Sequence, residues 1–342
     1  MPEGERPDWR DRIKRFLLGR IAAAVWRRRR TPRLALRARR AERQDRRAGR
    51  IPPPPSPVRT VSSVVCFISG PGRPKWLEDS IESVLASEGD DAHVIVIDDC
   101  SVDARESVIR ARFPQVEVLR RSFPTGGPPQ TWAQLQLGLR HAMEHHDFER
   151  FVRLDTDALV VGPSLSARLG EALASAPEAG LAGSFRVRAD GAPEERDYHI
   201  GVIERELRHD RTLADAVSRA RANGWQDGDV VQGGAMCLTA AAARAMQRDG
   251  WLDWRQSWHS IVTDDLAMSM FVSASGMGLH SIGDPQGIFA VANKDLPLPK
   301  EQLAGDPWVI AHSTRAGRDG EDEATLRAFF REQRASWPKP GS

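Results

Sequence analysis

Apolar and polar residues follow two recognisable patterns along the chain from residue 61 onward. Residues 61–68 are expected to form a strand, and 93–97 are a nearly continuous apolar run, which is typical of a strand buried on both faces of a sheet. Residues 76–86 place apolar side chains at helical spacing, and a second helix is expected over 104–111, before a short strand at 116–119. The order strand, helix, strand, helix, strand predicts a parallel, doubly wound sheet.

The remaining elements continue this alternation, and no internal repeat is visible. The pattern predicts, in order, a glycine-rich turn at 125–129, a helix over about 130–145, a strand at 151–154, a turn and strand within 228–238, a helix from 263, a strand and turn within 307–315, and a helix over 321–337. Trp251, Trp254 and Trp258 lie at helical spacing, which fits a core stripe or, alternatively, an aromatic acceptor site. His145 and His146 fall in a polar helix end and need no special role.

Charge divides the chain into unlike parts. Residues 1–50 carry 18 Lys/Arg and 6 Asp/Glu, a net charge of +12, whereas the rest of the chain carries −10. Residues 51–60 are rich in proline, and their first part is expected to be extended polyproline II. We therefore predict a basic, partly disordered arm over 1–50, a linker over 51–60, an α/β domain over 61–320, and a C-terminal helix and tail over 321–342.

The basic arm has an amphipathic pattern. Apolar residues recur at helical spacing between residues 13 and 25 while most basic residues fall on other faces, so residues 10–50 are expected to lie on an anionic membrane surface. A solvated tail or a helix docked on the domain is the alternative. Nucleic acid is not an expected partner, because the arm has no recognisable fold and only three aromatic residues, Trp9, Phe16 and Trp26. The apolar stretch 16–26 is too short to span a membrane and contains Arg20.

Three cysteines, Cys66, Cys100 and Cys237, are widely spaced and odd in number. They form no CxxC pair, so neither a zinc motif nor a disulfide framework is indicated. This usage fits a reducing compartment. The expected location is the cytoplasm, with the arm at the inner face of the membrane.

Carboxylates gather where two predicted strands end. Asp98 and Asp99 follow one apolar run, and Asp155 and Asp157 follow another. In open α/β sheets, ligands bind beyond the carboxyl ends of the strands. Oxygen ligands placed there suit Mg²⁺ or Mn²⁺, whose charge offsets the repulsion between the carboxylates. Helix capping or turn formation is the alternative explanation of such an Asp-x-Asp sequence.

In this context residues 61–315 resemble the GT-A glycosyltransferases, especially family 2. Residues 64–76 look like the first strand and nucleotide-binding loop of that family, and residues 94–103 resemble its second-strand signature. Residues 153–157 resemble its metal-binding DXD motif, and 263–265 its later acidic motif. The resemblance implies a GT-A, Rossmann-like fold with a mostly parallel central sheet flanked by helices, here preceded by the basic helical arm.

The resemblance also implies roles in binding a nucleotide-sugar donor. Asp99, with Asp98 as the alternative, is expected to hydrogen-bond the nucleobase, expected to be uracil. Ser69 would line that pocket, and Arg73 would approach the base or a phosphate. Asp155 would contact the ribose or the metal site.

Further residues are assigned to the metal and the donor sugar. Asp157 would bind the metal directly, and His312 matches the late histidine that completes this site in several metal-dependent GT-A enzymes. Gly233 and Gly234 would let the backbone approach the donor sugar, with a strand bulge as the alternative. Arg315 would neutralise the leaving diphosphate.

The acidic motif that opens the helix at 263 carries the expected base. Asp265 matches the second acid of the family's pair and would remove the acceptor hydroxyl proton, while Asp264 replaces the usual Glu. Helix capping by Thr263 and first-turn acids explains the same residues without catalysis.

The predicted activity is transfer of a sugar from a UDP-sugar to a hydroxyl acceptor, with Mn²⁺ or Mg²⁺ and with inversion at the anomeric carbon. The acceptor would be a glycan, a lipid-linked molecule or a small molecule, and residues 186–198 are a candidate acceptor loop. A nucleotidyltransferase acting on sugar phosphates is one alternative, although residues 69–75 lack a convincing triphosphate loop. A non-catalytic nucleotide-sugar or membrane-binding scaffold is the other, and the presence of both Asp157 and Asp265 argues against it.

Overall fold

The computed structural model describes residues 60–69, 74–89, 92–99, 105–121, 131–194, 196–254, 257 and 260–338. The basic arm and most of the proline-rich linker lie outside the described residues, as do Arg73, Cys100 and Trp258. The expectations stated for them therefore stay predictions.

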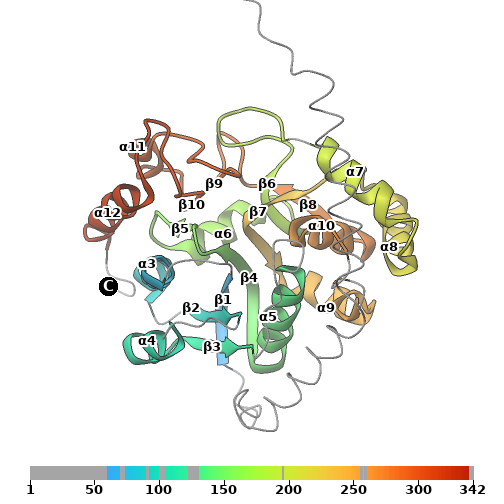
Figure 1. Cartoon of the computed structure of the whole chain (residues 1–342), viewed down its shortest axis with the longest axis horizontal. Coiled ribbons are helices and arrows are strands. Elements are labelled where there is room, and N and C mark those ends of the chain that lie inside the picture. The colour runs from blue at the N-terminus through green and yellow to red at the C-terminus, as the bar shows by residue number, and fades with distance from the viewer. Residues whose placement is uncertain are drawn as a thin grey trace, which may run out of the picture.

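A seven-stranded sheet forms the centre of the molecule (Figure 1), in the order β3-β2-β1-β4-β7-β6-β8. Its strands are β1 (Thr60–Ser69), β2 (Ala92–Asp98), β3 (Glu117–Arg120), β4 (His146–Asp155), β6 (Ala179–Phe185), β7 (Val231–Thr239) and β8 (Gly278–Ser281). Neighbouring strands are parallel except at β7, which runs antiparallel to both β4 and β6. The predicted class, mixed α/β with a mostly parallel sheet, is confirmed.

Alternate residues of the central strands face two separate cores, because side chains alternate across a sheet. Val65 and Phe67 of β1 belong to a core that includes residues from the helices on one side, whereas Val64, Cys66 and Ile68 belong to the core on the other side. Both sets are completely buried. This is why the apolar run that forms β1 is nearly continuous.

Helices cover both faces of this sheet (Figure 1). One side carries α3 (Pro74–Glu88), α4 (Arg105–Arg112) and α6 (Leu165–Ala174). The other carries α5 (Thr131–His145), α7 (Asp197–Glu206), α8 (Arg211–Ala222), α9 (Ala240–Arg248) and α10 (Asp264–Ala274). None of the helices in the described part of the chain is long and apolar enough to cross a membrane.

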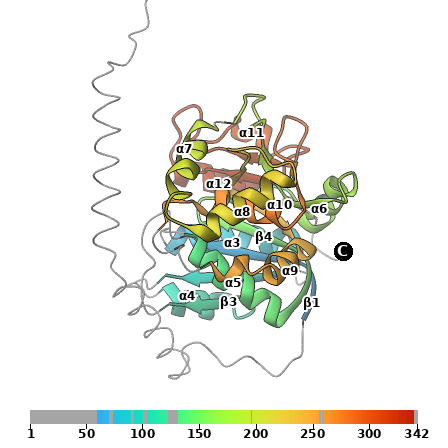
Figure 2. The same ribbon diagram turned by 90° about the vertical axis from the view of Figure 1, so that its right-hand side faces the viewer.

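A smaller sheet lies above the carboxyl end of β4 in Figure 1. In the turned view of Figure 2, α7 lies in the upper part of the molecule and α4 and β3 lie in the lower part. The smaller sheet has the order β5-β10-β9 and consists of β5 (Leu159–Val160), β9 (Phe289–Val291) and β10 (Ile310–His312). β5 follows β4 directly in the chain and pairs with β10. This pairing brings His312, at the end of β10, back to the residues that follow β4.

The C-terminal helix packs against the same region. α11 (Lys300–Leu303) precedes α12 (Glu323–Arg334), which buries Leu326 and Phe330 as its predicted apolar face suggests. Arg327 of α12 is almost completely buried and lies 3.1 Å from an Asp79 oxygen of α3. It also donates a hydrogen bond of 2.7 Å to the backbone oxygen of Thr156. The last helix therefore supports the turn between Asp155 and Asp157.

Two local expectations need correction. β4 begins at His146, five residues before the predicted strand, and follows α5 without an intervening loop. Trp251 lies in a short 3₁₀ helix, η3 (Trp251–Asp253), and packs with Trp254 against Phe271. Both indoles are almost completely buried, so they belong to the core and do not offer an acceptor surface.

Candidate active site

The carboxyl ends of β1 and β4 lie side by side, and their register pairs Ser69 with Asp155. Ser69 is almost fully buried, whereas the side chain of Asp155 is one-quarter exposed. Two residues further on, the turn after β4 carries the buried Asp157. The predicted DXD sequence thus stands at the edge of the sheet where ligands of open α/β folds bind.

The segment after β10 holds Asp157 in place. The hydroxyl of Ser313 donates to Asp157 Oδ2 at 2.7 Å, and Arg315 Nε lies 2.7 Å from the same oxygen. The backbone N–H and the hydroxyl of Thr314 both donate to the Asp157 carbonyl at 2.9 Å. The carboxylate direction is therefore fixed from a segment far away in the sequence.

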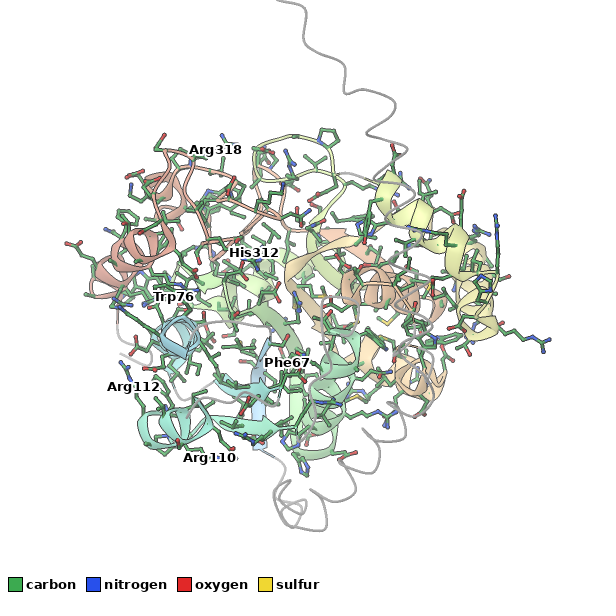
Figure 3. The ribbon with its side chains drawn as sticks, in the orientation of Figure 1. Phe67, Trp76, Arg110, Arg112, His312 and Arg318 are labelled. Atoms are coloured by element: carbon green, nitrogen blue, oxygen red, sulfur yellow. The ribbon has the colours of Figure 1, made fainter. Side chains whose placement is uncertain are left out.

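His312 faces both acids of the DXD sequence. Its Nε2 lies 3.4 Å from Asp157 Oδ1 and 3.7 Å from Asp155 Oδ2, while its side chain is only 6% exposed. Neither ring nitrogen makes a hydrogen bond. Figure 3 shows His312 near the middle of the molecule, between the two sheets.

These three side chains fit a divalent ion. One oxygen from each acid and one nitrogen of His312 lie within 4.8 Å of one another. Buried polar atoms in folded proteins nearly always have a partner, so an imidazole with two unpaired nitrogens beside two carboxylates indicates a missing ligand. Carboxylate oxygens with an imidazole nitrogen suit Mn²⁺ and similar ions.

The Gly233-Gly234 pair is packed against this group. Gly234 has φ +102°, and a Cβ built there would stand 2.3 Å from Nδ1 of His312. Gly233 donates its backbone N–H to Asp265 Oδ2 at 3.3 Å. In this structure the two glycines thus make room for His312 and Asp265, and their predicted contact with a donor sugar stays a prediction.

A buried arginine, Arg153, connects the DXD sequence with the acidic pair at the start of α10. Arg153 of β4 is 3% exposed, and its Nη2 lies 2.7 Å from Asp155 Oδ1 and 2.8 Å from Asp264 Oδ2. No role was predicted for Arg153 from the sequence. Its position inside an apolar strand could have indicated one, since a buried charge needs a charged partner.

Asp264 and Asp265, at the start of α10, have different surroundings. Asp264 also accepts a 2.7 Å hydrogen bond from Thr131, so its two oxygens face a hydroxyl and the Arg153 guanidinium. The Asp265 carboxylate accepts hydrogen bonds from two backbone N–H groups, of Leu266 at 2.8 Å and of Gly233 at 3.3 Å. Thr263 occupies the N-cap position without a side-chain cap, and both acids lie in the first turn of α10, so a favourable place at the helix N-terminus is still an alternative explanation of the pair.

The acids also differ in their affinity for protons. Burial raises the pKa of Asp155 and of Asp264 above the ordinary value, although Arg153 opposes the shift in both. Burial has the same effect on Asp157, but there His312, Ser313 and Arg315 outweigh it and hold the pKa well below its usual range. Asp157 is therefore the acid most firmly kept as a carboxylate, as a direct metal ligand must be.

The two acids at the end of β2 lie differently. Asp98 is fully buried and forms an ion pair at 3.0 Å with Arg120 of the neighbouring strand β3. Asp99 is partly exposed, and its carboxylate lies 3.6 Å from Arg121 Nε. Of the two alternatives for contacting a nucleobase, this arrangement favours Asp99.

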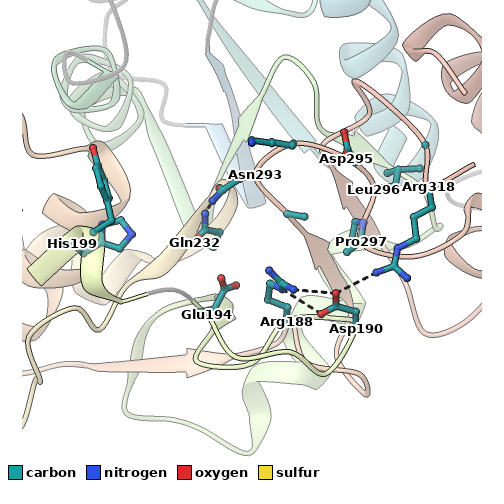
Figure 4. A pocket seen from close by; sticks show the side chains of 14 residues that line it. Arg188, Asp190, Glu194, His199, Gln232, Asn293, Asp295, Leu296, Pro297 and Arg318 are labelled. Atoms are coloured by element: carbon teal, nitrogen blue, oxygen red, sulfur yellow. Dashed lines mark hydrogen bonds and ion pairs between the residues drawn. The ribbon is translucent and has the colours of Figure 1, made fainter. Parts of the chain in front are cut away.

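A polar pocket of about 570 Å³ adjoins the site (Figure 4). Its walls include Arg188, Glu194 and Tyr198, all from the segment proposed as an acceptor loop, together with Gln232 and Arg318. Gln232 precedes Gly233 in β7. The pocket therefore opens next to the glycine pair and not at the buried tryptophans.

Comparison with known proteins supports the family resemblance. Residues 64–226 match the sequence model of the family described as Glycosyl transferase family 2. The predicted resemblance to family 2 of the GT-A glycosyltransferases is therefore confirmed over these residues. No curated protein matches the chain.

Solved structures with a similar chain course are also glycosyltransferases. The mannosyltransferase PcManGT from Pyrobaculum calidifontis, in complex with GDP-Man and Mn²⁺, is 15% identical with a TM-score of 0.39, and the match covers 78% of this chain and 66% of that one. TarS residues 1–349 from S. aureus is 14% identical with a TM-score of 0.29, covering 41% and 39%. Its complex with UDP is 15% identical with a TM-score of 0.30, covering 40% and 39%. The chain thus spans less than two thirds of the length of each, and these scores assign no residue a role.

Proposed function

We propose that this chain transfers a sugar from a nucleoside-diphosphate donor, expected to be a UDP-sugar, to a hydroxyl acceptor, with Mn²⁺ or Mg²⁺. The observation that carries the proposal is the convergence of Asp155, Asp157 and the unpaired, buried His312 at the carboxyl edge of a family 2 domain. Asp265, held by two backbone N–H groups, lies against Gly233, the glycine next to the one that packs on His312.

The residues divide the work as follows. Asp155, Asp157 and His312 would hold the ion, which supplies charge stabilisation for the leaving diphosphate. Ser69 and Asp99, with Arg73, would bind the nucleoside part of the donor. Arg315, whose side chain is 63% exposed, would turn from Asp157 toward the diphosphate when the donor binds.

Asp265 is proposed as the general base. It would take the proton of the acceptor hydroxyl as that oxygen attacks the anomeric carbon, and the bond to the diphosphate oxygen would break in the same displacement. Attack opposite to the leaving group inverts the anomeric carbon. Asp264 would keep Arg153 in place, because both of its oxygens face fixed partners.

The pocket next to Gln232 is proposed as the acceptor site. Its walls combine Arg188, Lys294 and Arg318 with Asp190, Glu194 and Asp295, so neither sign of charge dominates. Such a lining suits a neutral acceptor rich in hydroxyl groups, such as a glycan or the sugar of a lipid-linked molecule.

The proposal is tested by measuring nucleoside-diphosphate release from a panel of UDP- and GDP-sugars with Mn²⁺, Mg²⁺ or EDTA. We expect one donor to react only with metal, and Asp157→Ala and Asp265→Asn each to abolish the reaction. Asp253→Asn, a substitution at an exposed acid near the site in sequence, serves as the control. Metal-dependent binding of UDP without turnover of any donor, given a range of acceptors, would favour the non-catalytic scaffold.

The N-terminal arm is proposed to bring the domain to an anionic membrane surface, on the cytoplasmic side. This rests on the charge and spacing of residues 10–50 in the sequence. Co-sedimentation with phosphatidylglycerol vesicles should fall on deletion of residues 1–50 and in high salt. Equal binding to neutral vesicles would contradict the proposal. The division at residues 51–60 and 320 is likewise proposed, and limited proteolysis would test it.

A further inference from the structure

A second group of metal-binding side chains lies at the opposite edge of the main sheet. His93 is the second residue of β2, Glu117 opens β3 and His146 opens β4. His141 and His145 lie one turn apart at the end of α5, directly before β4. The group stands at the amino end of β4 and Asp155 at its carboxyl end, so about 30 Å of strand separates it from the candidate active site.

Contacts within this group are close. His146 Nε2 lies 2.7 Å from one Glu117 oxygen, and His141 Nε2 lies 2.5 Å from the other. The rings of His93 and His146 have centroids 4.7 Å apart. His93, Glu117 and His146 each offer one ligand atom, and these three atoms all lie within 4.8 Å of one another.

Burial supplies an independent observation. His146 is 5% exposed, and neither of its ring nitrogens makes a hydrogen bond of acceptable geometry, despite the short approach to Glu117. Its Nε2 thus faces only the Glu117 carboxylate, and its Nδ1 has no partner, which is uncommon for a buried polar atom. From the sequence, His145 and His146 were expected to lie in a polar helix end. In the structure, His146 is instead the buried first residue of β4.

We propose that these residues form a structural Zn²⁺ site, with His93, Glu117 and His146 as ligands and His141 in the fourth position. Zn²⁺ takes nitrogen and oxygen ligands at about 2.0–2.2 Å in a tetrahedral arrangement, which separates the ligand atoms by about 3.3 Å. The ligand atoms of His93, Glu117 and His146 need only small movements to reach that value, whereas His141, now beside the other Glu117 oxygen, must turn toward them. Three imidazoles select Zn²⁺ over the hard ions suited to the carboxylate-rich active site.

A bound ion would join four elements. α5, β2, β3 and β4 each contribute a ligand, and the chain passes from α5 to β4 without a loop. Zinc would then hold this junction, and its removal would lower thermal stability without touching the catalytic acids. The proposal is independent of the proposed transferase activity.

The experiment uses the tag-free, full-length chain in which Asp157→Ala and His312→Gln remove the other candidate metal group. After treatment with EDTA and dialysis, Zn²⁺ is titrated against a competing chelating dye, and the melting temperature is followed in parallel. We expect one equivalent of Zn²⁺ to bind and to raise the melting temperature. Each of His93→Gln and His146→Gln should weaken binding by at least about 100-fold, while His209→Gln, at an exposed histidine outside the group, should leave it unchanged.

Cobalt provides a second readout. Co²⁺ in the same protein should show the strong visible absorption of four-coordinate nitrogen and oxygen ligation, lost in His146→Gln. If that variant does not fold, Glu117→Gln, at a partly exposed position, gives the same comparison. Two results would overturn the proposal: no bound equivalent at about 10 μM Zn²⁺, or binding that survives all three substitutions. The group would then be an ordinary ion-pair cluster of histidines and a glutamate.

Discussion

Arg153, inside β4, forms an ion pair at 2.8 Å with Asp264, the first residue of α10. The same guanidinium nitrogen lies 2.7 Å from Asp155, so one buried cation connects the DXD sequence with the later acidic motif. Asp155 and Asp264 raise the pKa of Arg153 against the effect of its burial, and the guanidinium stays charged. The spacing between the DXD acids and Asp265 therefore depends on Arg153.

Arg153→Met should uncouple these two motifs. It leaves the buried carboxylate of Asp264 without its cation, which costs about 3–5 kcal/mol in the free energy of unfolding for a pair of this kind. Turnover should fall by at least about 100-fold, because the two motifs lose their common support. Urea unfolding and nucleoside-diphosphate release measure the two effects.

Arg150→Lys is the matched control for this change. Arg150 lies on the same strand, but its ion pair is with Glu149, an exposed neighbour in sequence. The free energy of unfolding should therefore change by less than about 1 kcal/mol. Unchanged stability in Arg153→Met would show that the buried ion pairs are not needed to hold the acids.

Gly234→Ala should weaken metal binding. Its methyl group would meet His312 at 2.3 Å, so the imidazole must leave its place beside Asp157. Gly224→Ala is the matched control, since Gly224 also has positive φ, +89°, but nothing lies within 4 Å of a Cβ there. Both variants bear the conformational cost of about 1 kcal/mol, and only Gly234→Ala should lose Mn²⁺ affinity by calorimetry. Equal loss in both would assign the effect to backbone strain.

Asp264→Asn should change how stability depends on pH. Because burial raises the pKa of Asp264, the folded protein binds this proton more tightly than the unfolded chain does. The resulting stabilisation is complete below the unfolded pKa of about 3.9 and is lost as pH rises through the folded value. The variant lacks this loss. Its free energy of unfolding, compared with that of the wild type, should therefore increase from pH 4 to pH 7.

Urea titrations of the metal-free proteins across this pH range make the measurement. Asp253→Asn, at an exposed acid, should show no such trend. A difference between Asp264→Asn and the wild type that stays constant with pH would mean that Arg153 fully offsets the burial of Asp264.

Residue type and period revealed much of this arrangement in advance. The apolar runs at 61–68 and 93–97 are strands buried on both faces, and the structure places strands there. Asp155 and Asp157 follow β4 as expected, because a strand that ends in acids must bring them to the edge of the sheet. That His312 lies beside them was inferred only from family resemblance, since β10 is far away in sequence.

Other features needed three-dimensional information. Asp98 and Asp99 are adjacent and chemically alike, and only the strand register, with Arg120 beside Asp98, separates the buried acid from the accessible one. His146 looked like the end of a helix, because nothing in the sequence marks the direct passage from α5 to β4. Its burial depends on partners from β2 and β3.

Arg327→Met should destabilise the fold and loosen the DXD turn. Arg327 is 1% exposed, pairs with the buried Asp79 and donates to the carbonyl of Thr156, between the two DXD acids. Its loss leaves the Asp79 charge with less compensation, and about 3–5 kcal/mol in the free energy of unfolding is expected. Arg331→Met is the matched control, because Arg331 contacts the same carboxylate at 3.2 Å but is 46% exposed, so less than about 1 kcal/mol should be lost. Mn²⁺ affinity should also fall in Arg327→Met alone, and retained affinity in a destabilised variant would show that α12 supports the fold without setting the geometry of Asp155 and Asp157.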